Sequence, residues 1–275
     1  PNQLNNENGY APGFGSTQQD VLIGSFIAAY TGAEINSKTI NPLRKMPLPN
    51  WRITYDGFTK IPYLKKFTEK FLKNLSFTHG YRSTLNVAGF TTNLDFVEGG
   101  AVTDLNGNIL SQRQILMVSI VEQFQPLLGV DLTLKNDLMA KFEFKKDRNI
   151  TLGLANNQIT EIKGTEFVLG TGYKLKKLQL PIKFDGKPIP PSDLDIRLDI
   201  NIRDNKTIIR KIVEEQNQPT AGQRIVRINF TANYSLSKNL MVRLYFDRIV
   251  NKPFISTAFP TANTSAGIAI RFTLN

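Results

Sequence analysis

Cysteine is absent from the 275 residues, and histidine occurs once, as His79. The first absence excludes disulfides and thiolate metal sites, although it leaves the redox compartment open. A single histidine excludes a zinc motif with two, and no nucleophile-elbow sequence is present. The glycines of GTG at 170–172 lack the rest of a dinucleotide fingerprint. We therefore expect no catalytic residue, metal site or cofactor, no enzyme activity, and an ordinary strand residue at His79.

Long apolar runs are also absent. No stretch approaches the ~20 apolar residues that a membrane-spanning helix needs. The chain opens with PNQLNNENGY, which has neither a methionine nor an apolar run, so we expect the C-terminal piece of a longer protein with its targeting segment upstream. The formal net charge is +11, but no dense basic run exists. Since the lysines and arginines are not gathered with aromatic residues, a nucleic-acid partner is not expected.

Residues 1–50 are rich in asparagine, glutamine, glycine and proline and are predicted to form an irregular segment. One apolar patch, VLIGSFIAAY at 21–30, interrupts them, and its periodicity does not decide between a short buried helix and a strand. In IPYLKKFTEKFL the apolar residues fall on one helical face, which predicts a short amphipathic helix near residues 61–72. This helix would either dock on a sheet or lie on anionic lipid.

From residue 74 onward apolar residues recur with a period of two, which is typical of strands with one apolar face. The clearest case is DLDIRLDINIRDN, and the alternation holds its register over residues 194–203 and 224–236. The apolar positions that we assign to one face are Leu194, Ile196, Leu198, Ile228, Phe230, Val242, Leu244, Ile270 and Phe272. The polar positions that we assign to the other face are Asp195, Arg197, Asp199, Asn201, Arg203, Arg227, Asn229, Arg243, Asp247 and Arg271.

Two architectures share this pattern. A soluble β-sandwich buries the apolar face against a second sheet, whereas a transmembrane barrel turns it to lipid. Soluble strands average about five or six residues, and strands that cross lipid need ~9–11. The predicted connections also alternate in length: short turns are predicted at 136–137, 204–205 and 237–239, and longer links at 176–192, 214–223 and 251–265. Length and connections favour the barrel.

The sequence therefore predicts an all-β fold, an antiparallel transmembrane β-barrel wall over residues 51–275 with one short amphipathic helix. The apolar positions given above would face lipid, and the polar ones would face a wet lumen. The long links would face outside and the C-terminus the periplasm. Residues 1–50 would line the lumen, plug it or contact a partner.

Several long motifs resemble one family. They are STQQDVLIGSFIAAYTG (16–32), PLPNWRITYDG (47–57), FTHGYRSTLNVAGFTTN (77–93), LANNQITEIKGTEFVLGTGY (154–173), IRDNKTIIRKI (202–212), NQPTAGQR (217–224) and the closing YFDRIVNKPFIST and FPTANTSAGIAIRFTLN. Together they look like the C-terminal end of the SprA/Sov family, the outer-membrane translocon of the type IX secretion system of Bacteroidota.

The resemblance implies a very large single-chain barrel of 36 strands in the cell outer membrane, of which this chain would supply about the last third or slightly less. Folded cargo proteins with C-terminal targeting domains would pass through its lumen, including adhesins for gliding motility in gliding species. The implied partners are the remainder of the same chain, a PorV-type small barrel, a plug protein, cargo and outer-membrane lipid. The alternatives left open are another outer-membrane porin or receptor barrel and a secreted β-sandwich binding module.

Overall fold

The computed structural model describes residues 13–32, 50–63, 70–96, 102–103, 107–181, 183–184, 187–188, 190–237, 239–255 and 258–273. Its elements, in chain order, are α1 (Gln19–Thr31), β1 (Trp51–Tyr55), the 3₁₀ turn η2 (Gly57–Lys60), β2 (Leu72–Thr92), β3 (Arg113–Leu134), β4 (Leu138–Gly153), β5 (Gln158–Leu178), β6 (Lys183–Phe184), β7 (Lys187–Pro188), β8 (Ser192–Lys211), β9 (Gln216–Ser235), β10 (Leu240–Pro253) and β11 (Thr261–Phe272).

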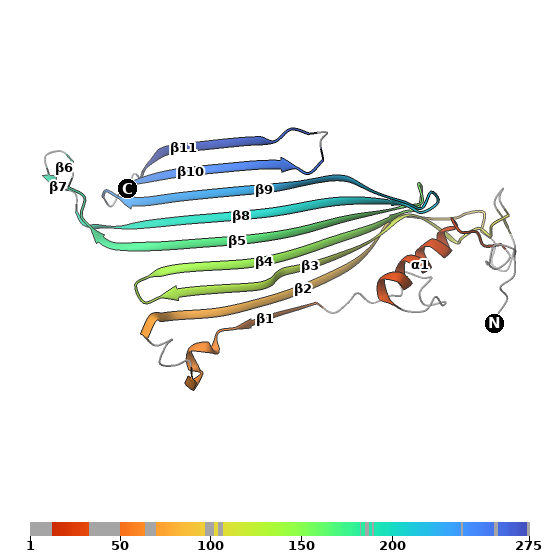
Figure 1. Ribbon diagram of the computed structural model, residues 1–275, viewed down its shortest axis with the longest axis horizontal. Coiled ribbons are helices and arrows are strands. Elements are labelled where there is room, and N and C mark those ends of the chain that lie inside the picture. The colour runs from red at the N-terminus through yellow and green to blue at the C-terminus, as the bar shows by residue number, and fades with distance from the viewer. Residues whose placement is uncertain are drawn as a thin grey trace.

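Nine strands form one antiparallel sheet in the order β1-β2-β3-β4-β5-β8-β9-β10-β11 (Figure 1). Every strand pairs with its predecessor along the chain, except that the small β6–β7 hairpin lies within the link from β5 to β8. Among the described residues, no strand pairs with the outer edge of β1 or of β11, so the sheet is open. The fold is all-β, as the sequence predicts, and the described residues contain one short α-helix, α1, which lies outside the 61–72 stretch for which the sequence predicts a helix.

The strands are long and stay paired with their neighbours along most of their length, with local register shifts. β2, β3, β5, β8 and β9 have between 20 and 22 residues each. At about 3.4 Å per residue such a strand spans nearly 70 Å, roughly twice the ~30 Å of a bilayer's hydrocarbon core. Only part of each strand could therefore lie in a membrane, and the rest must have other surroundings.

The connections correct part of the sequence prediction. The turns at 135–137 and 236–239 agree with it, but residues 204–205 lie inside β8, and the turn follows at 212–215. β9 begins at Gln216, so a long link over 214–223 is also wrong. The predicted alternation fails as well: the long link at 179–191 lies at the same end of the sheet as the short turns at 135–137 and 236–239 (Figure 1).

The apolar patch at 21–30 forms helix α1, so the segment 1–50 is not irregular throughout. Leu22, Ile23, Phe26 and Ile27 recur along one side of the helix and are buried. Gly32 ends the helix in the left-handed conformation, with φ 67°, where its N–H donates to Ala28 O at 2.8 Å. The helix predicted near 61–72 has its centre, residues 64–69, outside the described residues.

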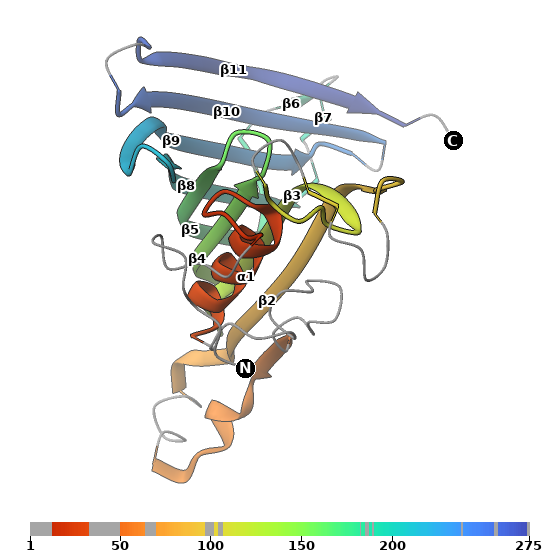
Figure 2. The ribbon, with the colours of Figure 1, turned by 90° about the vertical axis from the view of Figure 1, so that its right-hand side faces the viewer.

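The largest buried cluster joins α1 to the sheet (Figures 1 and 2). α1 lies at the end of the sheet opposite the last residues of β11. Its apolar side packs on residues of β3 and β4, whose fully buried members are Val118 and Leu152. The core of the described chain is therefore local to one end of the strands and does not extend along the whole sheet.

Candidate functional site

The strand register brings the nine predicted apolar positions to one face of the sheet. Residues that lie directly opposite each other in antiparallel strands point to the same side. Leu194 lies opposite Tyr234, which lies opposite Val242, and Val242 lies opposite Ile270. Along each strand the alternate positions follow, so the predicted set shares this side, which we call the apolar face.

The ten predicted polar positions share the other side, which we call the polar face. Asp199 lies opposite Asn229, and Asn229 lies opposite Asp247. The side chains of the latter two are joined by a hydrogen bond of 2.6 Å from Asn229 Nδ2 to Asp247 Oδ1. The register thus confirms which residues lie together, while the medium that each face meets stays a prediction.

The apolar face carries a continuous apolar band. On β8 it runs over the nine residues from Leu194 to Ile202, close to the ~9–11 residues with which a tilted strand crosses lipid. Neighbouring strands extend it, with Phe167 and Leu169 on β5 and Ile270 on β11. These side chains are 45%, 52% and 70% exposed. No described residue covers the band, and an apolar surface of this extent is unusual for a protein face in water.

Charged residues end the apolar band and separate it from the cluster under α1. Beyond Ile202 on the same face come Asp204 and Lys206. On β4 the charged pair Lys146 and Arg148 likewise comes between the band and the buried residues next to α1. The face is thus divided into an uncovered apolar band, a charged region and an apolar zone that is covered by a helix.

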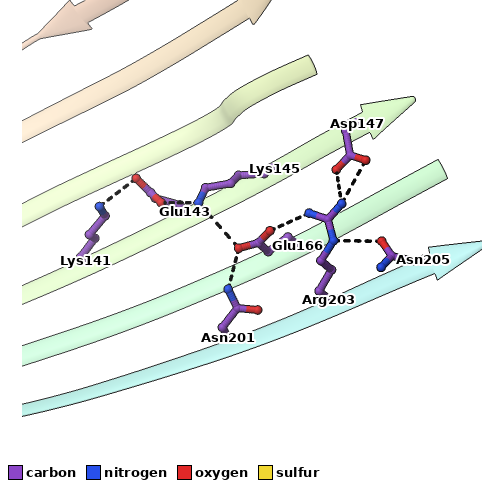
Figure 3. Close-up of polar contacts among 8 residues, drawn as sticks. All are labelled: Lys141, Glu143, Lys145, Asp147, Glu166, Asn201, Arg203 and Asn205. Carbon is purple, nitrogen blue, oxygen red and sulfur yellow. Dashed lines mark hydrogen bonds and ion pairs between the residues drawn. The ribbon is translucent and has the colours of Figure 1, made fainter. Parts of the chain in front are cut away.

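A network of charged side chains crosses the polar face of β4, β5 and β8 (Figure 3). Its centre is Arg203, whose guanidinium group donates to Glu166 Oε2 at 2.8 Å, to Asp147 Oδ1 at 2.9 Å and to Asn205 Oδ1 at 2.9 Å. Asn201 donates to the other Glu166 oxygen at 2.5 Å. These contacts fix three neighbouring strands to one another through their polar face.

Lysines extend this network along β4. Lys145 lies 3.1 Å from Glu143 and 3.7 Å from Glu166, and Lys141 lies 2.9 Å from the other Glu143 oxygen (Figure 3). The network contains three basic and three acidic side chains, so their charges balance. The network therefore carries no excess of either charge.

Four of the ten predicted polar positions make side-chain hydrogen bonds or ion pairs with other described residues: Asn201, Arg203, Asn229 and Asp247. Those with none are Asp195, Arg197, Asp199, Arg227, Arg243 and Arg271. Sequence reasoning did not propose the acidic partners Asp147 and Glu166 as site residues. A signal existed, because both lie at polar positions of alternating stretches, at Asp147 in LMAKFEFKKD and at Glu166 in TEFVLG.

The remaining ionisable groups offer little chemistry. His79 lies in β2, with Nδ1 2.7 Å from Leu127 O. No His, Asp or Glu cluster in the described ranges could hold a metal ion. Outside the sheet, burial and the bond to Glu122 raise the pKa of Tyr30, and Lys176 lowers the pKa of Asp137 in the β3–β4 turn. Both shifts follow from structural contacts.

No helix in the described part of the chain is long and apolar enough to cross a membrane. Comparison with known proteins adds no relative: no protein-family model matches the sequence. No curated protein matches it either.

Proposed function

We propose that this chain forms part of the wall of a wide β-barrel in the outer membrane, through which folded proteins are exported. The observation that carries the proposal is the uncovered apolar band on one face of the sheet, opposite a polar face with balanced charge. A band over the nine residues from Leu194 to Ile202 suits lipid, and a charged face suits a wet lumen. The resemblance to the SprA/Sov family supplies the kind of passenger, a folded secreted protein.

The division of the apolar face supports the same proposal. Beyond the charged region an apolar zone recurs, and there α1 covers it, with Leu152 and Val118 fully buried. A zone that projects into water needs such a cover, whereas a band that meets lipid does not. The sandwich alternative requires a second sheet over the band, and the described residues contain none.

The open edges support a larger assembly. β11 has unpaired backbone groups along its outer side, and hydrocarbon cannot satisfy such groups. We propose that this edge pairs with a strand from the remainder of the same barrel chain, at or near a seam that a small partner barrel contacts. A plug protein in the resting state belongs to the same proposal.

Site-directed photo-cross-linking in cells tests the proposal with the full-length protein. A photoreactive residue at Arg197, Arg227 or Arg243 should capture exported protein during secretion, because none of these side chains is held by a described neighbour. The matched positions on the apolar face are Leu198, Ile228 and Leu244.

The apolar positions should cross-link to lipid and not to exported protein. Equal capture of exported protein from both faces would overturn the assignment of the two media. Passage of small solutes with no capture from either face would favour a small-solute porin. A full-length protein that stays soluble without detergent would overturn the membrane placement.

A further inference from the structure

Basic side chains gather on the apolar face where the apolar band ends. On β10 the band ends at Phe246, and Arg248 is the next residue on that face. We call the basic residues of this region the cationic belt. They are Lys146, Arg148, Lys163, Lys206, Arg210, Arg224, Arg248 and Lys252, and they come from β4, β5, β8, β9 and β10.

The cationic belt has a marked excess of positive charge. Among the described residues, three acidic side chains share its region of the face, Glu122, Glu161 and Asp204. Eight basic against three acidic side chains leave an excess of five positive charges. The network on the polar face has equal numbers of each sign, whereas the belt has an excess of positive charge.

A buried carboxylate organises one part of the belt. The side chain of Glu161 has no exposed surface, and it lies 2.6 Å from Arg148, 3.1 Å from Lys163 and 2.7 Å from Arg210. These three side chains are themselves 40%, 50% and 40% exposed. Glu161 thus holds the three basic side chains side by side, and they keep N–H donors that Glu161 does not use. Because these side chains are already ordered, less side-chain entropy is lost when they bind an anionic ligand.

A hollow beside this cluster has a lining that suits a phosphorylated lipid. Its volume is about 300 Å³, and its lining includes three basic residues, Lys146, Arg148 and Lys163, two acidic ones, Glu122 and Asp147, and Phe124. Three basic side chains can bind phosphate oxygens through charge-assisted hydrogen bonds. Phe124 gives the same hollow an apolar wall on the face that carries the apolar band.

The cationic belt lies on the half of the strands away from Phe272, the last residue of β11. If the C-terminus faces the periplasm, the belt meets the outer leaflet, whose phosphorylated lipid is lipopolysaccharide. We propose that the cationic belt binds the phosphate groups of lipopolysaccharide and so holds the wall at a defined depth. This inference rests on the proposed function, because it takes the apolar band as facing lipid.

The test uses full-length protein purified in detergent and titrated with purified lipopolysaccharide. In the belt variant, Lys146, Lys206, Arg248 and Lys252 are all changed to glutamine. No carboxylate of a described residue lies within 4 Å of these four side chains, so the variant breaks no described ion pair. Since each basic residue near a charged lipid surface contributes to binding, we expect lipopolysaccharide affinity to fall at least tenfold.

A matched control removes the same number of charges from the polar face. In it Arg197, Arg227, Arg243 and Arg271 become glutamine, and none of these pairs with a carboxylate in the described ranges. Lipopolysaccharide affinity should stay within twofold of the wild-type value. An equal loss in both variants would overturn the proposal, because the effect would then come from net charge alone.

Four alternative ligands identify what the belt recognises in the wild-type protein. Dephosphorylated lipopolysaccharide should bind at least tenfold more weakly, and inorganic phosphate at millimolar concentration should not displace the intact lipid. Preference for anionic phospholipid vesicles, or for an acidic protein, would overturn the proposal. Unchanged lipopolysaccharide binding by a belt variant that inserts into membranes would also overturn the lipopolysaccharide proposal, but it would not affect the proposed barrel wall. Failure of the wild-type protein to enter membranes would overturn the proposed function itself.

Discussion

Gly164 lies directly opposite Asp147 on the polar face, and the aspartate side chain fills the space where a side chain of residue 164 would stand. A β-carbon added to Gly164 would come closer than 3.0 Å to both carboxylate oxygens, a separation that real β-carbons do not show. The glycine thus leaves room for Asp147 to lie across β5 and reach Arg203, whose Nη2 is 2.9 Å from Asp147 Oδ1. The ion pair between β4 and β8 depends on the lack of a side chain between them.

Gly164→Ala should therefore destabilise the folded protein by displacing Asp147 from Arg203. In a double-mutant cycle, Gly164→Ala should cost less in an Asp147→Ala background, with a coupling of about 0.5–3 kcal/mol. The measurement is the unfolding transition of the full-length protein in detergent. Strictly additive effects would show that the alanine acts on the backbone alone and that the close approach to Asp147 has no consequence.

Arg203 holds the two carboxylates of Asp147 and Glu166 beside each other, and its replacement leaves both without that cation. These carboxylates are 21% and 13% exposed, so Arg203→Gln should cost about 1–3 kcal/mol, between the values for exposed and buried ion pairs. Arg203→Lys should recover only part of the loss, because an ammonium group lacks the planar fork. The shift in thermal midpoint measures both.

The control for this series is Arg197→Gln. Arg197 lies on the same strand and the same face as Arg203, and it pairs with no carboxylate in the described ranges. Its replacement should change stability by no more than about 0.5 kcal/mol, as is usual for surface substitutions. Equal shifts at both positions would contradict a specific role for the network. Raising the salt concentration should also reduce the difference between them.

The division into faces could be predicted from the sequence, because alternation is a property of each strand by itself. Once Leu194 and Asp195 are assigned to opposite sides, the remaining positions of β8 follow without knowledge of the neighbouring strand. The pairing of strands was harder to predict, since it depends on register. Arg203 and Asp147 are 56 residues apart along the chain, and no local pattern relates them.

The turn prediction at 204–205 failed for a physical reason. Asp204 and Asn205 are typical turn residues, but here Asp204 has a partner on the neighbouring strand β9 and Asn205 has one on its own strand. Asp204 accepts two hydrogen bonds of 2.7 Å from Arg224, and Asn205 accepts one from Arg203. With these side chains satisfied, the strand continues to Lys211, and Glu215, with φ 53°, takes the left-handed position in the turn that follows. Cross-strand pairing thus overrode local turn propensity.

Helix α1 should be needed only where the strands leave the membrane. Ile23 is 1% exposed and packs in the cluster with Val118 and Leu152. Ile23→Asn should undock the helix, because it removes core packing and buries an amide without a partner. A cysteine placed at Val118 should then react with a water-soluble maleimide in a chain that otherwise offers no cysteine within these 275 residues.

The matched variant for the helix is Ala29→Asn, on the exposed side of α1. It should leave the cysteine at Val118 protected and the barrel intact. Reaction of the cysteine at Val118 while Ile23 is unchanged would contradict the protection of this position by α1. Loss of membrane insertion in Ile23→Asn would contradict a helix that covers the sheet only outside the bilayer.

Neighbouring residues on β9 give the sharpest test of the two faces. Ile228 lies on the apolar face and Asn229 on the polar face, so one lysine can be moved between them with almost no change in sequence position. Ile228→Lys should impair membrane assembly, although by less than the about 2–4 kcal/mol that a lipid-facing basic side chain costs at the midplane, because Ile228 lies opposite Arg248 near the end of the apolar band. Asn229→Lys should assemble normally, because its ammonium group can still reach Asp247, the present partner of Asn229.

Leu244 repeats this test on a second strand. Leu244 lies on the apolar face of β10, opposite Ala232 of β9, and is 45% exposed. Leu244→Lys should therefore impair membrane assembly as Ile228→Lys does. The measurement is the amount of protease-resistant full-length protein in the outer-membrane fraction, at matched synthesis. Equal tolerance of lysine at Ile228, Asn229 and Leu244 would mean that both faces meet water, and the apolar band would then need a protein partner to cover it. If assembly fails for the lysines at Ile228 and Leu244 but not for the lysine at Asn229, the loss of assembly depends on the face of the sheet and not on the strand. Lipid is then the medium that the apolar band faces.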